Sequence, residues 1–192
     1  MIGLFGGSFD PIHHGHLITA QTLVHSLGLA ELRFIPAREQ PFKHGRHQAP
    51  AEVRAKMVEL AIAGEPRLRL DRLELERPGP SYTVDTLRAL RVREPASEFV
   101  LLVGSDAAAE LAAWREAAEL PRLASIVVFA RPGSKGLSSP LISRVIPVPG
   151  IEISATAIRR RVRQGLSIRY WVPDAVAGVI AAERLYLTDD DQ

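Results

Sequence analysis

The residues best suited to chemistry lie near the N-terminus, in the run Gly6-Gly7-Ser8-Phe9-Asp10-Pro11-Ile12-His13-His14-Gly15-His16. His13 and His16 are three residues apart at the start of an expected helix, so they project from one face beside the positive end of the helix dipole. Gly6 and Gly7 let the backbone approach a ligand that a Cβ would exclude. Such a site can hydrogen-bond to the oxygens of a polyphosphate and stabilise the negative charge that grows during substitution at phosphorus.

Two plainer explanations of the same run stand beside this one. The glycines could serve only a tight turn, or the histidines could bind zinc, although a His pair at this spacing without a third ligand makes a poor metal site. The chain has no cysteine, which excludes a disulfide framework, a thiol nucleophile and Cys-ligated metals. The run matches neither GxGxxG nor GxxxxGK(S/T), which argues against a dehydrogenase or a P-loop enzyme. We therefore favour phosphate chemistry with no protein-bound metal.

These side chains need a scaffold, and the apolar pattern of the chain predicts one. Strands are expected at Met1–Phe5, Leu32–Pro36, Leu68–Leu75, Phe99–Val103, Ile126–Phe129 and, at a sheet edge, Val145–Val148. Helices are expected from about His14 to Gly28, from Pro50 to Gly64 with Val53, Met57 and Leu60 as its apolar stripe, after Thr83 as N-cap, and at Ala155–Gln164 and Asp174–Glu183. This alternation predicts an α/β fold: a Rossmann-like, doubly wound parallel sheet with a small C-terminal helical portion.

Length and composition limit the remaining classes. With 192 residues, 46% of them hydrophobic, we expect one domain over residues 1–188 and an acidic tail at 189–192. The apolar runs are too short to span a membrane, and the N-terminus does not resemble a signal peptide, so we expect a cytoplasmic protein with no membrane partner. A net charge of +2 is weak for a nucleic-acid binder, and no nucleic-acid partner is expected. Residues 38–50 look like a long loop.

The histidine run matches the GxFxPxHxGH signature of the nucleotidyltransferase superfamily, whose relatives include the class I aminoacyl-tRNA synthetases with their HIGH motif. A second stretch, Ile153-Ser154-Ala155-Thr156-Ala157-Ile158-Arg159, resembles the superfamily's ISSTxIR, with Ala155 in place of the second serine. Ser154 is positioned as an N-cap, with free backbone N–H groups behind it and Arg159 on the same helix. These groups form a second anion site, suited to the β- and γ-phosphates of ATP.

Within the superfamily the chain resembles the bacterial nicotinate-nucleotide adenylyltransferases. Three further stretches carry this resemblance: Ser81–Leu87, Gly104–Asp106 followed by Trp114, and Tyr170–Pro173. The related phosphopantetheine adenylyltransferases are typically shorter and have Thr in place of His13. The resemblance implies transfer of AMP from ATP to nicotinate mononucleotide, giving nicotinate adenine dinucleotide (deamido-NAD) and pyrophosphate. It also implies Mg²⁺ bound mainly through the ATP phosphates.

The resemblance also implies roles for individual residues. The catalytic residues would be His13, His16 and Arg159. The same three would bind ATP together with Gly7, Ser8, Phe9, Gly104, Asp106, Arg131, Ile153, Ser154 and Thr156. The mononucleotide would be held by Lys43, Ser81, Tyr82, Thr83 and Trp114, with Phe42 where the family often has His.

Alternatives remain for several of these residues and for the function. Asp106 either binds a ribose or caps a helix, and Trp114 either stacks on the nicotinate ring or belongs to the core. A nucleotide-binding regulator without turnover is one rival function. An RNA-binding module using the arginines at 159–163 is another, although we expect only Arg159 to face the site and the others to be solvated. The sequence leaves open the choice between nicotinate and nicotinamide mononucleotide, the extent of loop closure, and whether the chain forms a homo-oligomer.

Overall fold

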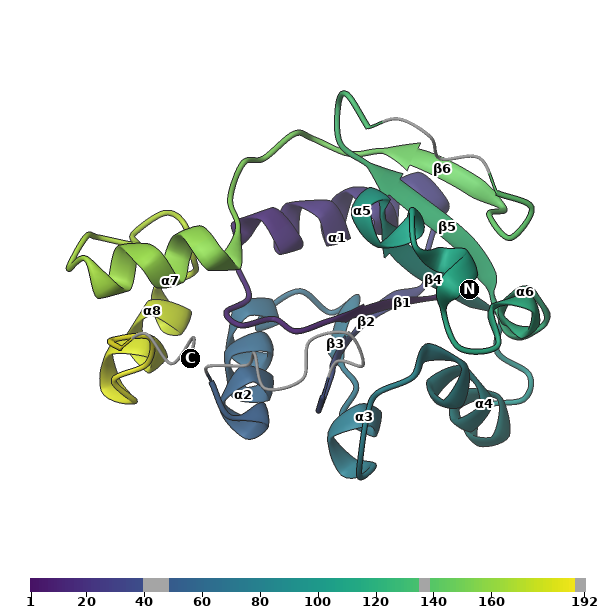
Figure 1. The fold of residues 1–192 in the computed structure, drawn as a ribbon, viewed down its shortest axis with the longest axis horizontal. Coiled ribbons are helices and arrows are strands. Elements are labelled where there is room, and N and C mark those ends of the chain that lie inside the picture. Colours follow the sequence, from purple (N-terminus) through teal and green to yellow (C-terminus); the bar gives the residue numbers. More distant parts are fainter. Residues whose placement is uncertain (40–48, 135–138, 189–192) are drawn as a thin grey trace.

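A computed structural model of the chain describes residues 1–39, 49–134 and 139–188, and these form a single parallel sheet with helices on both faces (Figure 1). The six strands lie in the order β3-β2-β1-β4-β5-β6. They are β1 (Ile2–Gly7), β2 (Glu31–Pro36), β3 (Leu68–Leu70), β4 (Phe99–Gly104), β5 (Ser125–Ala130) and β6 (Arg144–Pro147). The predicted doubly wound sheet is confirmed, including the position of β6 at an edge.

Helices connect successive strands, as a parallel sheet requires. They are α1 (His14–Leu27), α2 (Ala51–Ile62), α3 (Leu73–Glu76), α4 (Thr83–Arg93), α5 (Ser105–Ala108), α6 (Leu120–Leu123), α7 (Ala155–Arg163) and α8 (Asp174–Ala182), with single 3₁₀ turns η1 (Leu111–Ala113) and η2 (Ala117–Glu119). The first helix ends as predicted at Gly28, whose φ of 62° lies in the left-handed region that favours glycine. In Figure 1, α7 and α8 lie together at one side of the molecule, away from α4 and α6.

The sheet buries a separate apolar core on each face, because successive strand residues point to opposite sides. On β4, Val100 and Leu102 join the core that packs against α1, α2, α7 and α8. Phe99, Leu101 and Val103 join the core that packs against α4 and α6. The continuous apolar run of this strand, predicted to be central, is thus explained by burial on both faces.

Three local predictions are wrong. The strand expected over Leu68–Leu75 ends at Leu70, and the short helix α3 follows it. Leu60 of the expected apolar stripe is 38% exposed, and the buried face of α2 carries Ala55, Val58 and Ile62 with Met57. Thr83 is the first residue of α4, since Tyr82 occupies the N-cap position and no side chain caps this helix. The spacing of Leu and charged residues after Leu70 fits one helical turn as well as it fits a strand.

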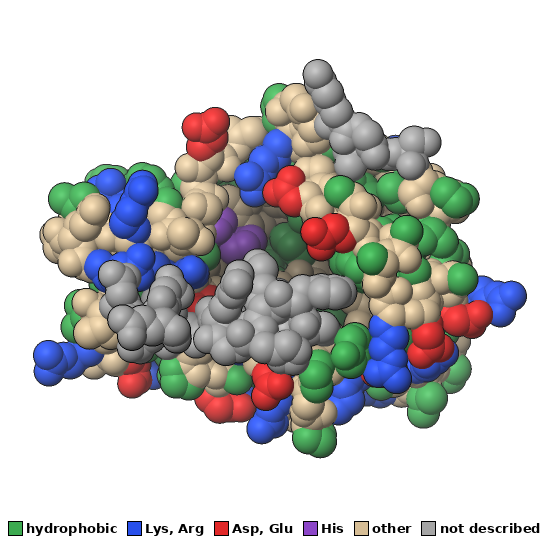
Figure 2. All heavy atoms as spheres, in the orientation of Figure 1, with side chains coloured by type: hydrophobic (Ala, Val, Ile, Leu, Met, Phe, Trp, Pro, Cys, Tyr) green, Lys and Arg blue, Asp and Glu red, His purple; other side chains and the backbone are tan. Residues whose placement is uncertain are grey.

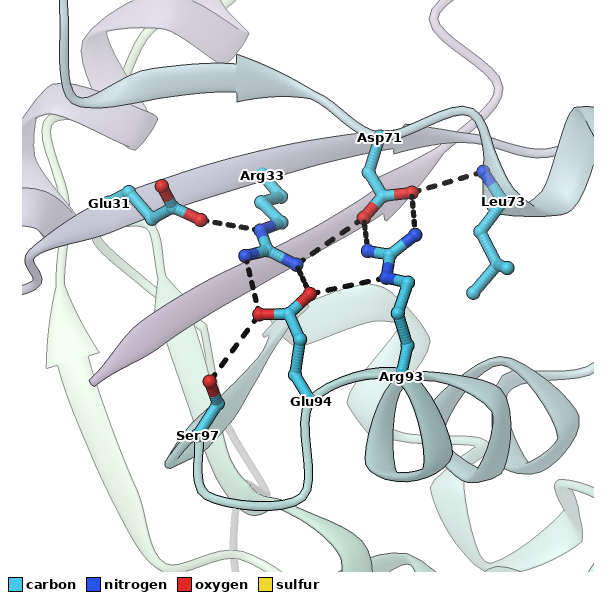
Figure 3. A network of polar contacts seen from close by, with 7 residues as sticks. All are labelled: Glu31, Arg33, Asp71, Leu73, Arg93, Glu94 and Ser97. Carbon is cyan, nitrogen blue, oxygen red and sulfur yellow. Dashed lines mark hydrogen bonds and ion pairs between the residues drawn. The ribbon is translucent and has the colours of Figure 1, made fainter.

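An ion-pair network ties the edge of the sheet to α4 (Figure 3). At its centre, the guanidinium of Arg33 on β2 donates to both carboxylate oxygens of Glu94, at 2.6 and 2.9 Å. Arg93 pairs with Asp71, and Asp71 also lies 3.6 Å from Arg33. Hydrogen bonding to Arg33 lowers the pKa of Glu94 to about 2. Because the Arg33 side chain is only 13% exposed, its charge is compensated inside the protein rather than by water.

We expect Arg33→Met to lower the free energy of unfolding by about 2–4 kcal/mol, because it leaves Glu94 and Asp71 without their shared, largely buried partner. Urea unfolding of the two proteins would measure the difference. Arg122→Met is the matched control, since Arg122 is 77% exposed and pairs only with Glu119 among the described residues. Equal losses in the two variants would contradict a special role for the network.

Candidate active site

The candidate site lies at the carboxyl edge of the sheet, where β1 and β4 lie side by side. The chain winds away from these two strands in opposite directions, which makes this the point where parallel sheets bind nucleotides. A cavity of about 490 Å³ opens here, a volume suited to one small ligand. Gly6 and Gly7 at the end of β1 and Gly104 at the end of β4 line it. Figure 2 shows a hollow in this face of the molecule, with histidine side chains exposed inside it.

The two histidines of the first motif stack on each other beside this cavity. Their ring centroids lie 3.7 Å apart, with 22° between the planes. His13 is the N-cap residue of α1, and its backbone N–H donates to Nδ1 of His16 at 3.3 Å. An Nδ1 that accepts a hydrogen bond carries no proton, so neutral His16 holds its proton on Nε2. The fold therefore fixes the tautomer that leaves Nε2–H available as a donor.

Burial keeps both imidazoles neutral. The pKa of His13 is lowered to about 4, chiefly because the ring is buried and then because of the positive charges of Arg131 and His14. The pKa of His16 is also lowered, again mainly by burial and then by His13 and Arg131. Among the described residues nothing hydrogen-bonds to Nδ1 of His13, which is buried. A buried ring nitrogen without a partner is the kind of group that a ligand satisfies.

The glycines of the motif are required by packing as well as by ligand approach. A Cβ on Gly15 would lie 3.0 Å from Nδ1 of His13, and one on Gly7 would lie 2.9 Å from the ring of Phe9. Phe9 itself adopts φ 48° and is 2% exposed. Its ring packs with Phe5 and against His16, 5.1 Å between centroids. The proposed ATP contact of Phe9 is therefore limited to its backbone.

The second motif reaches the first through an arginine. Ser154 caps α7 as predicted, since its Oγ accepts a hydrogen bond from the Ala157 N–H at 3.1 Å. From the same helix Arg159 donates to the backbone carbonyl of Asp10 at 2.8 Å, 149 residues earlier in the chain. Ile153 also lies close to the first motif, its carbonyl oxygen 3.6 Å from where a Gly15 Cβ would stand. The two predicted anion sites thus lie against each other.

Buried polar groups that the sequence analysis missed hold the first motif in place. The guanidinium of Arg54 on α2 is 1% exposed and donates to the carbonyl oxygens of Ser8, Ala37, Arg38 and Ala49. One side chain thus joins the loop after β1 to the end of β2. The only sequence signal was an arginine on a helix whose neighbours are apolar.

Asp10 provides a second tie. Its buried carboxylate accepts hydrogen bonds from the backbone N–H of Ala49 at 3.2 Å and from the hydroxyl of Tyr186 at 2.7 Å. Burial and the Asp10 carboxylate raise the pKa of Tyr186. No local pattern around Tyr186 predicted this contact, because its partner lies at the other end of the chain.

Residues expected to bind the mononucleotide also line the cavity. Its lining includes Ser81, Tyr82, Thr83 and Trp114, and it also includes Asp106. Trp114 is partly buried and packs against the α4-side core, and it also lines the cavity, so its stacking on the nicotinate ring stays a prediction. Asp106 lies in the first turn of α5, whose N-cap residue is Gly104.

Three charged residues of this lining were missed by the sequence analysis: Glu74, Glu110 and Arg115. Glu74 is 7% exposed, accepts a hydrogen bond from Thr86 at 2.7 Å, and has its pKa raised by burial. Arg115 follows Trp114 directly and lies over the ring of Tyr82. The position of Arg115 after the candidate stacking residue was the signal that could have found it.

The remaining predicted residues are placed as follows. Arg131 is exposed just after β5, near enough to the histidines for its charge to lower their pKa values. Lys43 and its neighbour Phe42 lie outside the described residues. Arg161 of α7, expected to be solvated, instead donates to the Ser167 carbonyl at 2.9 Å and stacks on Trp171. This packing removes one arginine from any surface available to RNA.

Two kinds of feature are absent from residues 1–39, 49–134 and 139–188. No helix there is long and apolar enough to cross a membrane. No group of three or more His, Cys, Asp or Glu side chains there could hold a metal ion.

Comparison with known proteins agrees with this geometry. The family model described as cytidylyltransferase-like matches residues 4–161. A probable nicotinate-nucleotide adenylyltransferase of Thermus thermophilus is 48% identical over 96% of this chain and 98% of its own. One of Thermomicrobium roseum is 42% identical over 97% of this chain and 92% of its own. Among solved structures, Plasmodium falciparum nicotinic acid mononucleotide adenylyltransferase complexed with NaAD shares the fold, with a TM-score of 0.78 at 19% identity over 96% of each chain.

A doubly wound sheet with a histidine pair and a helix N-terminus at its switch point is suited to binding the phosphates of a nucleotide. The predicted superfamily is confirmed by the matching family model. The chain belongs to the nicotinate-nucleotide adenylyltransferase family.

The buried histidine pair predicts a pH-dependent stability. The unfolded chain protonates His13 near pH 6.5, whereas the folded chain resists protonation until about pH 4. The free energy of unfolding should therefore fall as the pH drops through this window, by about 3 kcal/mol from His13 alone. Urea unfolding at several pH values would measure this slope, and His13→Asn should reduce it. His25→Asn is the control, since that ring lies on the surface; the same slope in His13→Asn as in the parent chain would contradict the assignment.

Proposed function

We propose that this protein transfers AMP from ATP to nicotinate mononucleotide, releasing pyrophosphate and forming nicotinate adenine dinucleotide. The observation that carries the proposal is the contact of Arg159 with the Asp10 carbonyl, which joins both phosphate-binding motifs, while Gly6 and Gly7 of the first motif line an aromatic cavity. The family of the chain and its 48% identity to a Thermus relative support the choice of acceptor.

In this reaction the protein has only to position the two phosphates and to stabilise negative charge. The phosphate of the mononucleotide is already an anion at neutral pH, so it needs no general base. Its oxygen attacks the α-phosphorus of ATP, the bond from that phosphorus to the bridging oxygen breaks, and pyrophosphate leaves with the bond electrons. Holding the two phosphates in line and stabilising the growing negative charge supplies the rate enhancement.

The chain's own groups divide this work. The Nε2–H of His16 donates to the α-phosphate, and the neutral His13 ring beside it contacts the same region. The N-terminus of α7, capped by Ser154 and followed by Thr156, faces the β- and γ-phosphates, and Arg159 adds a positive charge there. Backbone groups of Gly7, Ser8, Phe9 and Ile153 complete the ATP site, with Gly104 and Asp106 at the ribose and Arg131 at its border.

The acceptor occupies the cavity. Trp114 stacks on its pyridine ring, and the segment Ser81–Thr83 offers backbone and hydroxyl groups. Lys43 would meet its phosphate. Two ties hold the Ser81–Thr83 segment in place: the Arg38 N–H donates to the Ser81 Oγ at 3.1 Å, and the Ser81 N–H donates to the Glu39 carbonyl.

The residues fit Mg²⁺ carried by the nucleotide rather than held in a protein cage. The phosphate end is built from imidazole and guanidinium donors with the hydroxyls of Ser154 and Thr156, which suit phosphate oxygens and metal-bound water. When bound, Mg²⁺ would neutralise charge on the departing pyrophosphate. Arg159 and the α7 N-terminus would share that task.

The direct test is pyrophosphate release with ATP and Mg²⁺ and three acceptors in parallel: nicotinate mononucleotide, nicotinamide mononucleotide and phosphopantetheine. We expect the largest kcat/KM with nicotinate mononucleotide. Release with phosphopantetheine alone would contradict the proposed acceptor. ATP binding without release in any reaction would contradict the proposed activity and favour a nucleotide-binding regulator.

We expect His16→Ala to lower kcat by about 10²–10³-fold, the effect of losing a preorganised donor to a transition state. Steady-state kinetics with ATP varied would measure it, and thermal unfolding would check the fold. The control is His25→Ala, on the exposed side of the same helix. Turnover within a few fold of the parent enzyme would contradict the role of His16.

A further inference from the structure

The charged residues that line the cavity bear on the choice between an acid and an amide substrate. Among the described lining residues, three side chains are acidic, namely Glu74, Asp106 and Glu110, and Arg115 alone is basic. A pyridine carboxylate entering this cavity therefore meets acidic groups and one guanidinium. A neutral carboxamide would not need that cation.

The direction of the acceptor in the cavity follows from the reaction. Its phosphate must reach the α-phosphate beside His13 and His16, at the Gly6–Gly7 end of the lining. The pyridine ring then lies at the other end, among Tyr82, Trp114 and Arg115. The carboxylate on that ring is thereby brought toward the one cation of the described lining.

The Arg115 guanidinium is held in place, but its hydrogen-bond donors are not all used. Its Cζ lies over the Tyr82 ring, 4.7 Å from the ring centre, and the side chain is 52% exposed. Its ion pairs with Asp85 and Glu116 measure 3.6 and 3.8 Å, longer than hydrogen bonds. Glu116 already receives two hydrogen bonds from Arg88, at 3.1 and 2.6 Å. Donors of Arg115 thus remain available to a substrate.

We propose that Arg115 is a specificity-determining residue that selects nicotinate over nicotinamide mononucleotide by pairing with the ring carboxylate. This inference rests on the proposed function and goes beyond it, because it assigns the acid preference to one side chain. Tyr82 positions the guanidinium, and Trp114 holds the ring beside it. The acidic groups of the lining repel a carboxylate, so the preference for the acid depends on this one pairing.

The test is the ratio of kcat/KM for nicotinate mononucleotide to that for nicotinamide mononucleotide, measured in the parent enzyme and in Arg115→Gln. We expect the ratio to fall at least about tenfold, the effect of one charge-assisted hydrogen bond, mostly through a higher KM for the acid. The KM for ATP should stay unchanged. Arg115→Lys keeps the charge and should retain more of the preference than Arg115→Gln.

Arg122→Gln is the control, because it removes the same charge from a residue that is 77% exposed, pairs with Glu119 and lies outside the described cavity lining. Its ratio should stay within about threefold of the parent value, the size of an exposed charge effect. An unchanged ratio in Arg115→Gln, or an equal fall for both substrates, would overturn the inference. Failure of the parent enzyme with both mononucleotides would instead contradict the proposed function, so the two failures are distinguishable.

Discussion

The loop between β1 and α1 exposes backbone carbonyls to the protein interior, and the structure depends on how these are satisfied. A buried carbonyl without a donor costs on the order of 1–3 kcal/mol. The guanidinium of Arg54 meets this need for Ser8 and for the end of β2, and Arg159 meets it for Asp10. Two cations from different helices thus fix the loop whose histidines face the phosphates.

In this arrangement the charge of Arg54 serves only to hold the loop in place. Arg54 gives its hydrogen bonds to the backbone and is hidden from solvent, so it shapes the loop without competing for a ligand. The histidines at the end of the same loop stay neutral because burial disfavours their charged forms. A neutral imidazole that is not paired with a carboxylate can donate its N–H to a phosphate without first breaking an ion pair. The ion pairs around Arg33 instead join β2 and the segment after β3 to the end of α4 (Figure 3).

The parts of the fold that repeat a simple pattern were predictable from sequence. The continuous apolar run at Phe99–Val103 indicated a central strand, and the glycine at position 28 indicated the end of α1, because both features depend only on local chemistry. The turn at α3 was not predictable, since Leu68–Leu75 fits both a strand and a helical periodicity. The N-cap of α4 was not predictable either, because the helix begins one residue later than its Tyr82 cap and the cap-forming residue type, Thr83, is already inside it.

The motifs of the candidate site were readable for a similar reason, and their supports were not. His13, His16 and Ser154 stand in short runs whose spacing carries their chemistry. Arg54, Tyr186 and Arg115 act through partners that are distant in the sequence or that depend on how a loop folds. Their roles follow from three-dimensional contacts, because the apolar neighbours of Arg54 and the position of Arg115 after Trp114 do not reveal what these side chains contact.

The hydrogen bond between Tyr186 and Asp10 spans 176 positions of the chain. During synthesis the β1 loop leaves the ribosome long before Tyr186 does, so it spends most of translation without this partner. Contacts of such large separation form late in folding, because a long loop must close before they contribute. A nascent chain that already has its first strands paired would therefore still lack a finished nucleotide site.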